Sequence, residues 1–424
     1  MIGTLPGLLL RPAALLGLIL LLAACASTPA PSIPEGDFRE RVQRQEAGGV
    51  IVSAGVPSAG EAQQLFGKPL YARGIQPVWL EIHNTRPDRV TFLPVGLDPQ
   101  YFTPLEAANM DAGDSATPDS LIDEYFIDQS IDLLVEPGEK LSGFIFSKLD
   151  EGTKAFNVDI ASAADFHTFT FFIPVPGLDI DHYAVDWENL YPREKFIELE
   201  KEPLIEAIEQ FDCCVTDAKG ENTGDPLNLV LIGKPLDVYT AFIRAGWDET
   251  ETVTATSGWK TAMSFLSGGE YRYSPVSSLY VFGRKQDVAF QKARDNIHER
   301  NHLRLWMSWV THEGLPVWIG QISRDIGVRF TTKTITTHKI DPNVDETREY
   351  LLENLAYAQS LQAFGYVGGV GRVPRDQPRG NLTGDPWFTD GYRLVLWLSS
   401  EPVTIADLEI LDWRSPVQVH EVLE

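Results

Sequence analysis

The chain has 424 residues, of which 43% are hydrophobic and 22% charged, as expected for a folded protein of two or three domains. Its formal net charge of -25 excludes the broad basic surface that nucleic-acid binding requires. The same charge opposes binding to anionic lipid headgroups and favours cations as partners.

The first 24 residues have the pattern of a cleavable export signal. Arg11 precedes an apolar run over residues 13–24, which is shorter than the ~20 residues that a membrane-spanning helix needs. The run ends in LAAC, with Cys25 last, and this resembles the bacterial lipobox. The resemblance implies cleavage before Cys25 and acylation of this residue, for example with palmitate, which anchors the chain in a membrane. An ordinary secretory signal with an incidental Cys25 is the alternative.

Residues 25–44 are expected to be the lipidated cysteine and a flexible tether, because the segment is rich in Pro, Ser, Thr and Ala. Ala26 follows the lipidated position, and in the enteric sorting rule a residue other than Asp there implies the outer membrane, facing the periplasm. No later segment approaches ~20 uninterrupted apolar residues. Cys25 is therefore the predicted anchor.

Residues 45–182 have the pattern of an all-β unit, with short alternating segments bounded by Gly, Pro and Asn. In the strand expected at 76–84, Val78, Leu80 and Ile82 share one face. The repeated strands and turns predict an immunoglobulin-like β-sandwich. Within it, residues 110–119 form an acidic loop, for which calcium binding and a solvated loop are the two interpretations.

Residues 183–200 are expected to connect this sandwich to a mixed α/β (α+β) domain over residues 201–424. A strand, a Gly-Lys-Pro turn and an amphipathic helix form a βα unit near the start of that domain. Further strands and a second long helix follow. The expected helices are 202–211, 235–247 and 343–359, and the expected strands are 227–232, 278–283, 302–309, 315–322, 326–332 and 392–398.

Six sequence blocks between residues 225 and 398 carry a family resemblance. They are LNLVLIG at 227–233, AGW at 245–247, LYVFGRKQD at 279–287, NHLRLW at 301–306, SRDIGV at 323–328 and THKIDP at 337–342. In this order they resemble the LssY C-terminal domain family. That family often follows membrane domains linked to lipid chemistry, so the resemblance implies an envelope setting, and it implies no activity.

The densest polar cluster of the sequence lies in this second region. Alternation along the strand near 302 puts His302, Arg304 and Trp306 on one face and Leu303 and Leu305 on the other. If the leucine face is the core, His302 and Arg304 point into solvent or a cleft. His302, Arg304 and His338 are the weak catalytic candidates.

Two interpretations remain open for this cluster. His302, His338 and Asp341 could hold a divalent metal such as Zn or Mn. Arg304, Arg329 or Arg348 could then bind a phosphate through two N–H groups. The alternative is that the polar residues after His338 only begin and cap a helix. In that case Asp341 starts a turn, Asn343 caps the helix, and Asp345 and Glu346 sit in its first turn.

Two cysteines remain besides Cys25, and they are adjacent. We expect Cys213 and Cys214 to be small, partly buried thiols, and the alternative is a labile vicinal disulfide in an oxidising periplasm.

The sequence predicts a lipid-anchored envelope protein that binds another envelope component, either a protein or a lipid-related partner. No cofactor is evident. The alternative function is a metal-assisted hydrolase acting on a phosphate-bearing envelope substrate. Whether the chain is an enzyme is left open.

Overall fold

Two four-stranded antiparallel sheets form the N-terminal domain of the protein. The computed structural model describes residues 37–110, 120–177, 185–187, 189–250, 278–293, 300–329 and 337–414. The predicted anchor Cys25 and, apart from Met110, the acidic loop at 110–119 lie outside these residues. The first sheet has the order β1 (Gln43–Ala47), β2 (Val50–Gly55), β3 (Ile75–Asn84) and β6 (Lys140–Lys148). The second has the order β5 (Leu134–Val135), β4 (Val90–Leu93), β7 (Thr153–Ala161) and β8 (Phe166–Pro174).

The two sheets share one apolar core. Val78, Leu80 and Ile82 of β3 are fully buried in it, as the alternation predicts, together with Phe169 and Phe171 from β8. The strand order differs from the predicted immunoglobulin arrangement, in which the third strand lies in the opposite sheet. Here β1, β2 and β3 pair in succession within one sheet, because each returns antiparallel to the one before.

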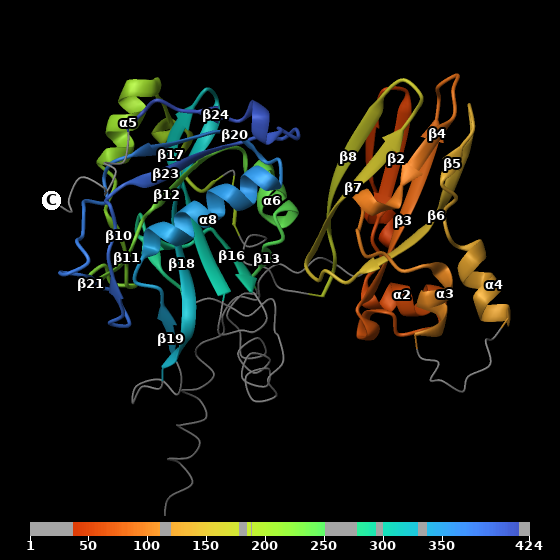
Figure 1. Ribbon diagram of the computed structural model, residues 1–424, viewed down its shortest axis with the longest axis horizontal. Helices are drawn as coiled ribbons and strands as arrows, with labels where there is room; N and C mark the ends of the chain where they lie inside the picture. Colours follow the sequence, from red (N-terminus) through yellow and green to blue (C-terminus); the bar gives the residue numbers. More distant parts are fainter. Residues whose placement is uncertain are drawn as a thin grey trace, which may run out of the picture.

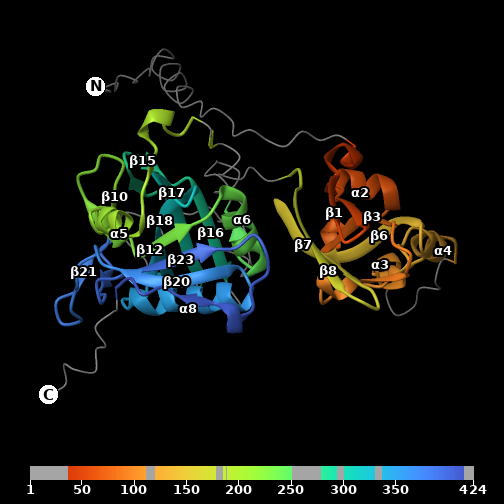
Figure 2. The same ribbon diagram turned by 90° about the horizontal axis from the view of Figure 1, so that it is seen from above.

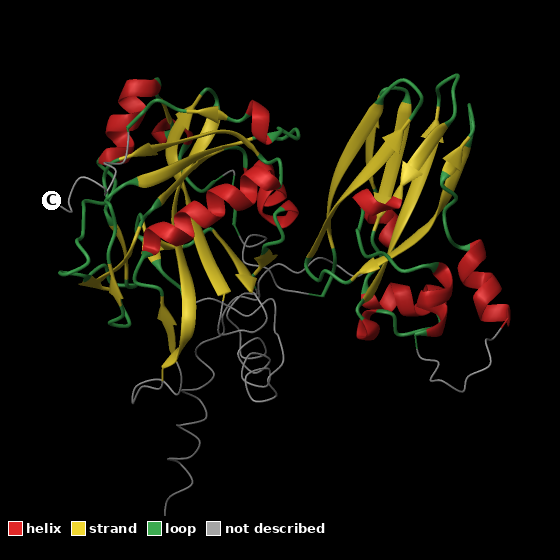
Figure 3. Cartoon of the chain, in the orientation of Figure 1, coloured by secondary structure: helices red, strands yellow, loops and turns green. Residues whose placement is uncertain are grey.

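Helices also belong to this domain, so the all-β prediction is wrong in this respect. They are α2 (Ala59–Phe66), α3 (Pro104–Asn109) and α4 (Ser120–Asp128), and they gather at one end of the two sheets (Figure 3). Ser58 with Glu61 and Thr103 with Glu106 form capping boxes that start α2 and α3. These two Ser/Thr-x-x-Glu patterns are visible in the sequence and could have predicted both helices.

A ten-stranded mixed sheet is the centre of the C-terminal domain. Its main order is β13 (Asp248–Glu249), β16 (Val288–Ala293), β17 (Arg300–His312), β18 (Leu315–Arg329), β12 (Leu229–Ile232), β23 (Arg393–Leu398), β20 (Leu361–Val367) and β24 (Glu409–Ile410). Outside this order, β19 (Thr337–Ile340) pairs with β18 and β9 (Ile197–Glu198) with β17. The segments predicted as strands 315–322 and 326–332 belong to a single long strand, β18, as far as Arg329.

Helices cover both faces of this sheet (Figures 1 and 2). Residues of α6 (Pro235–Arg244) and α8 (Val344–Tyr357) pack with Leu303 and Leu305 on one face, and residues of α5 (Lys201–Glu209) pack on the other face with Trp306. The three predicted helices of this domain are therefore confirmed. Short strands form two further sheets. One consists of β10 (Cys214–Thr216), β11 (Thr223–Pro226), β14 (Tyr280–Val281) and β15 (Arg284–Lys285), and the other of β21 (Arg379–Gly380) and β22 (Pro386–Trp387).

The described part of the connector packs onto the C-terminal domain. Tyr191 is buried, and its hydroxyl donates to the carbonyl of Met307 at 2.9 Å. The N-terminal domain meets the same domain through Phe172, whose ring contacts Tyr239 edge-on at 5.6 Å, and through Thr153, which hydrogen-bonds the buried Glu249. No helix among the described residues is long and apolar enough to cross a membrane.

The guanidinium of Arg393 is fully buried at the centre of this domain. It donates to the backbone carbonyls of Ile208, Phe211, Asp212, Leu227 and Gly369. Burial lowers the pKa of Arg393 to about 10, so the side chain keeps its charge at neutral pH. We call these five carbonyls the carbonyl cage of Arg393. Through them, Arg393 connects the end of α5, the start of β12 and the loop after β20 to β23.

We predict that Gly369→Ala destabilises the protein by ~2 kcal/mol more than Gly371→Ala. Both glycines have positive φ, +115° and +81°, so both replacements share a backbone cost. Only at Gly369 would the new Cβ lie 2.6 Å from Nη1 of Arg393 and 3.0 Å from the backbone of Glu209. Urea unfolding of the two variants measures the difference, and equal losses would contradict the role of the cage.

Candidate functional site

Strand β17 places the candidate residues His302 and Arg304 inside the fold. The alternation is as predicted, since Leu303 and Leu305 enter the core under α6 and α8 while Trp306 enters the core on the opposite face. His302 is 6% exposed and Arg304 8% exposed. The expectation that these two side chains point into solvent or a cleft is wrong, because both faces of the sheet are covered.

His302 belongs to a buried polar cluster. Its Nε2 lies 2.5 Å from Oδ2 of Asp325 on the neighbouring strand β18. Arg300 has its Nε 3.7 Å from the same oxygen and donates from Nη1 to Gln291 Oε1 at 2.6 Å. Burial lowers the pKa of His302 to about 4, although Asp325 acts in the opposite direction. The imidazole is therefore neutral at pH 7.

Arg304 lies in the adjoining part of this cluster. It donates to Gln321 Oε1 at 2.9 Å, and burial lowers its pKa to about 10 against the attraction of Asp225. Asp225 is also buried, which raises the pKa of its carboxyl, and it accepts a hydrogen bond from Asn381 Nδ2 at 3.2 Å. These contacts are internal to the fold and connect β17 and β18 to β11 and the loop after β21.

The proposed metal ligands are only partly described. Asp341 Oδ1 accepts the backbone N–H of Asn343 at 3.0 Å, which is the turn that the sequence suggested before α8. Asn343 is the N-cap residue of that helix, but its side chain donates to Glu346 rather than capping the backbone. The side chains of His338 and Arg329 lie outside the described part of the chain. Within the described part, no group of three His, Cys, Asp or Glu side chains could hold a metal ion.

We predict that acidification weakens the fold through His302. Its pKa is 6.5 when unperturbed and about 4 in the fold, so between these values the unfolded chain binds more protons. The contribution of His302 is complete above pH 6.5 and is lost as the pH falls to about 4, by up to ~3 kcal/mol.

The test is the free energy of urea unfolding measured across this pH range. Between pH 6.5 and 4 the free energy of unfolding should fall by up to ~3 kcal/mol less in His302→Gln than in the parent protein. His83→Gln changes a partly exposed histidine and should show the same pH dependence as the parent. An unaltered slope in His302→Gln would show that the ring titrates normally.

A large hollow lies beside α8, on the outside of the C-terminal domain. We call it the α8 pocket, and its volume is about 1410 Å³. Its wall consists of the first half of α8, residues 372–376, residues 388–390 and Arg324 from β18. Tyr350 and Phe388 contribute half-buried aromatic rings to it, and the guanidinium of Arg324 lies 5.1 Å from the ring centre of Tyr350.

Arg348 holds the base of the α8 pocket together and is 2% exposed. Its five N–H groups donate to both carboxylate oxygens of Asp390, to Glu349 and to the carbonyl of Tyr392. Burial opposes its charge, but Asp390, Asp345 and Glu349 outweigh this and raise the pKa of Arg348. Since all its donors are used, Arg348 is not placed to fork onto a phosphate as the sequence suggested.

Two other arginines of the α8 pocket remain uncommitted. Arg372 and Arg375 are exposed, and within the described part of the chain neither makes a hydrogen bond or an ion pair. They lie on the segment that follows the Gly-rich stretch 368–371. The pocket therefore presents two free cations beside two aromatic rings, on a wall that also carries Asp345, Glu346, Glu349, Glu353, Asp376 and Asp390.

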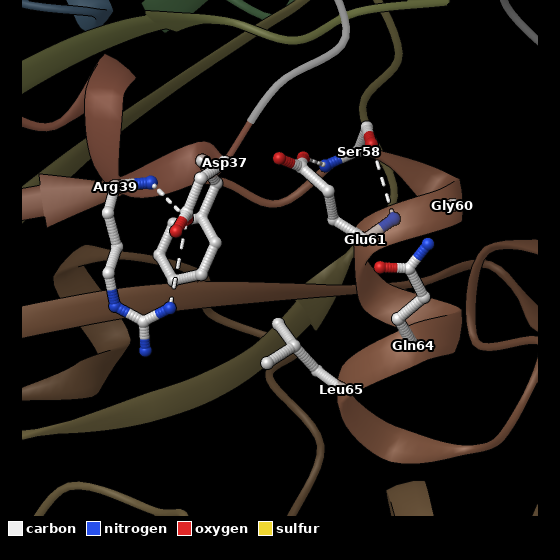
Figure 4. Close-up of a pocket in the computed structure, with 8 residues that line it drawn as sticks. Asp37, Arg39, Ser58, Gly60, Glu61, Gln64 and Leu65 are labelled. Carbon is white, nitrogen blue, oxygen red and sulfur yellow. Dashed lines mark hydrogen bonds and ion pairs between the residues drawn. The ribbon is translucent and has the colours of Figure 1, made fainter.

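A smaller hollow of about 510 Å³ lies on the N-terminal domain (Figure 4). The acidic side chains of this hollow are engaged in local contacts. Glu61 accepts the backbone N–H of Ser58 at 2.6 Å, and Asp37 accepts the backbone N–H of Arg39 at 3.0 Å. These groups start α2 and a short 3-10 helix (Phe38–Arg41), so the hollow follows from helix capping.

Cys213 and Cys214 form a disulfide bond. The expectation of two free thiols is therefore wrong, and the alternative of a vicinal disulfide holds. Cys214 is buried in a small core with Val373 and Trp387, and Cys213 packs against the same core from a partly exposed position.

The C-terminal domain resembles a known family over most of its length. Residues 206–392 match the family described as LssY C-terminus. The resemblance predicted from the sequence is thereby confirmed. This LssY C-terminal domain includes both the His302 cluster and the α8 pocket. No curated protein matches the chain.

The sequence alone did not reveal the α8 pocket of the LssY C-terminal domain. Its exposed arginines, Arg372 and Arg375, are not among the candidate residues of the sequence, and the base of the pocket requires Asp390 to lie beside Arg348. One signal was available. Asp345 and Arg348 stand three residues apart on one helix, a spacing that favours an ion pair, here 3.4 Å long.

Proposed function

We propose that this protein is a lipid-anchored component of the cell envelope that binds a partner through the α8 pocket. The observation that carries the proposal is the exposed pair Arg372 and Arg375 beside Tyr350 and Phe388, in a hollow of about 1410 Å³. Arginine and aromatic side chains are the residues that contribute most binding energy at protein interfaces. The anchor at Cys25 would hold this pocket near a membrane, facing the periplasm of an outer membrane.

The chemistry of the α8 pocket indicates the kind of partner. Free guanidinium groups bind carboxylate or phosphate groups, and the aromatic rings beside them favour an apolar contact. Carboxylates such as Glu346, Glu353 and Asp376 also line the pocket, so the two arginines are the cationic part of a wall of mixed charge. The partner that fits is an envelope component presenting an anionic group next to an apolar surface.

A metal-assisted hydrolase is less well supported. Its intended ligand His302 is buried with Nε2 at 2.5 Å from Asp325, and Arg304 is buried against Gln321. Neither side chain faces the α8 pocket. Both residues serve the packing of β17 against β18 in the described structure.

Charge reversal at the pocket tests the binding proposal. A photoreactive benzoylphenylalanine in place of Tyr350 should cross-link the partner in cells. The double variant Arg372→Glu/Arg375→Glu should lower the cross-link yield by ~tenfold, because two attractive charges become repulsive. Arg44→Glu/Arg193→Glu makes the same charge change at exposed residues outside the pocket, and its yield should equal that of the parent. Equal yields in both double variants, or no cross-link from Tyr350, would contradict the proposal.

The anchor has a separate test. Cys25→Ser removes the acylated thiol, and the protein should then move from the membrane fraction to the soluble envelope fraction after cell disruption. Ser27→Ala, a change within the tether, serves as the control and should leave the protein in the membrane fraction. Continued membrane association of Cys25→Ser would show that another contact holds the chain.

A further inference from the structure

The disulfide between Cys213 and Cys214 joins neighbours in the sequence, which distinguishes it from a structural cross-link. A disulfide stabilises a fold mainly by closing a loop in the unfolded chain, and the effect grows with loop length. Two adjacent residues enclose no such loop. This bond therefore contributes little to stability, and its presence needs another explanation.

The two sulfur atoms have different surroundings. Cys214 is 5% exposed and packs with Val373, Trp387 and Ile340. Cys213 is partly exposed, so it is the more accessible residue of the pair. An attacking thiolate would thus reach Cys213 and displace Cys214.

A cation stands beside the accessible sulfur. Nη1 of Arg379, the first residue of β21, lies 4.0 Å from Sγ of Cys213. The guanidinium is held over the ring of Trp387, 5.9 Å from its centre. A neighbouring Arg stabilises a thiolate relative to a thiol, which is the condition that makes a cysteine reactive in exchange.

We infer that Cys213 and Cys214 form a redox-active site whose substrate class is a dithiol oxidoreductase. One thiolate of the dithiol attacks Sγ of Cys213, the bond between Cys213 and Cys214 breaks, and Cys214 leaves with the electron pair and takes a proton. The second thiol of the dithiol then loses its proton and attacks the dithiol sulfur that is bonded to Cys213 in the mixed disulfide. Cys213 leaves as a thiolate beside Arg379, and the dithiol has become a disulfide. The chain has gained two electrons, and the dithiol has lost them.

The first experiment follows native-state exchange in the full chain, purified in detergent, with dithiothreitol as the dithiol probe. Samples are quenched with acid and alkylated, and the peptide containing both cysteines is weighed by mass spectrometry. Reduction should be at least ~tenfold faster than global unfolding under the same conditions, with an unchanged circular dichroism spectrum. Reduction no faster than unfolding, or a purified protein whose two thiols stay free in oxidised glutathione, would overturn the inference.

The second experiment uses the reduced protein and measures alkylation by iodoacetamide at pH 7. Cys213 should react faster than the buried Cys214, and Arg379→Gln should slow Cys213 by ~fivefold, the effect of losing one charge at 4.0 Å in a watery setting. Lys219→Gln removes an exposed cation on the turn after β10 and should leave the rate unchanged. Equal rates at the two cysteines, or equal rates in the two variants, would contradict the assigned geometry. Neither experiment involves the α8 pocket, so their results are independent of the proposed function.

Discussion

The carbonyl cage around Arg393 is the constraint on which the C-terminal domain depends. A guanidinium in a fully buried position needs acceptors for its N–H groups, and here five backbone oxygens from distant segments provide them. The cage fixes where α5 ends and where β12 begins. A lysine could not replace this arginine, because an ammonium offers three donors from one point.

The other buried arginines follow the same logic with different partners. Arg300 and Arg304 use the amide oxygens of Gln291 and Gln321, and Arg348 uses carboxylates. An acidic chain thus places several of its few cations in the interior, where each holds segments together. Arg372 and Arg375 differ because no described contact of the fold employs them, and this is why the α8 pocket, rather than the denser cluster around His302, is the candidate for binding.

Local patterns predicted local structure well. Alternation assigned Leu303 and Leu305 to the core, and the spacing of apolar residues located α6 and α8. The error about His302 arose because one strand's pattern does not reveal whether its polar face is covered, and here that face is buried with partners such as Asp325 on the next strand. The α8 pocket was missed for the same reason, since its base requires Asp390 beside Arg348. The state of Cys213 and Cys214 was also open, because two adjacent thiols and a vicinal disulfide have the same sequence.

The parallel pairing of β12 with β23 has a consequence for the order in which the chain folds. Leu229 pairs with Leu394 at the centre of the large sheet, so this strand of the core has no neighbour on that side until almost the whole chain has emerged. The N-terminal sheets close earlier, with β8 ending at Pro174. During synthesis the first domain can therefore begin to fold early, while the second must stay open until residue 398 has been added. Its apolar strands are then exposed to chaperones and proteases for the time needed to synthesise the residues between β12 and β23.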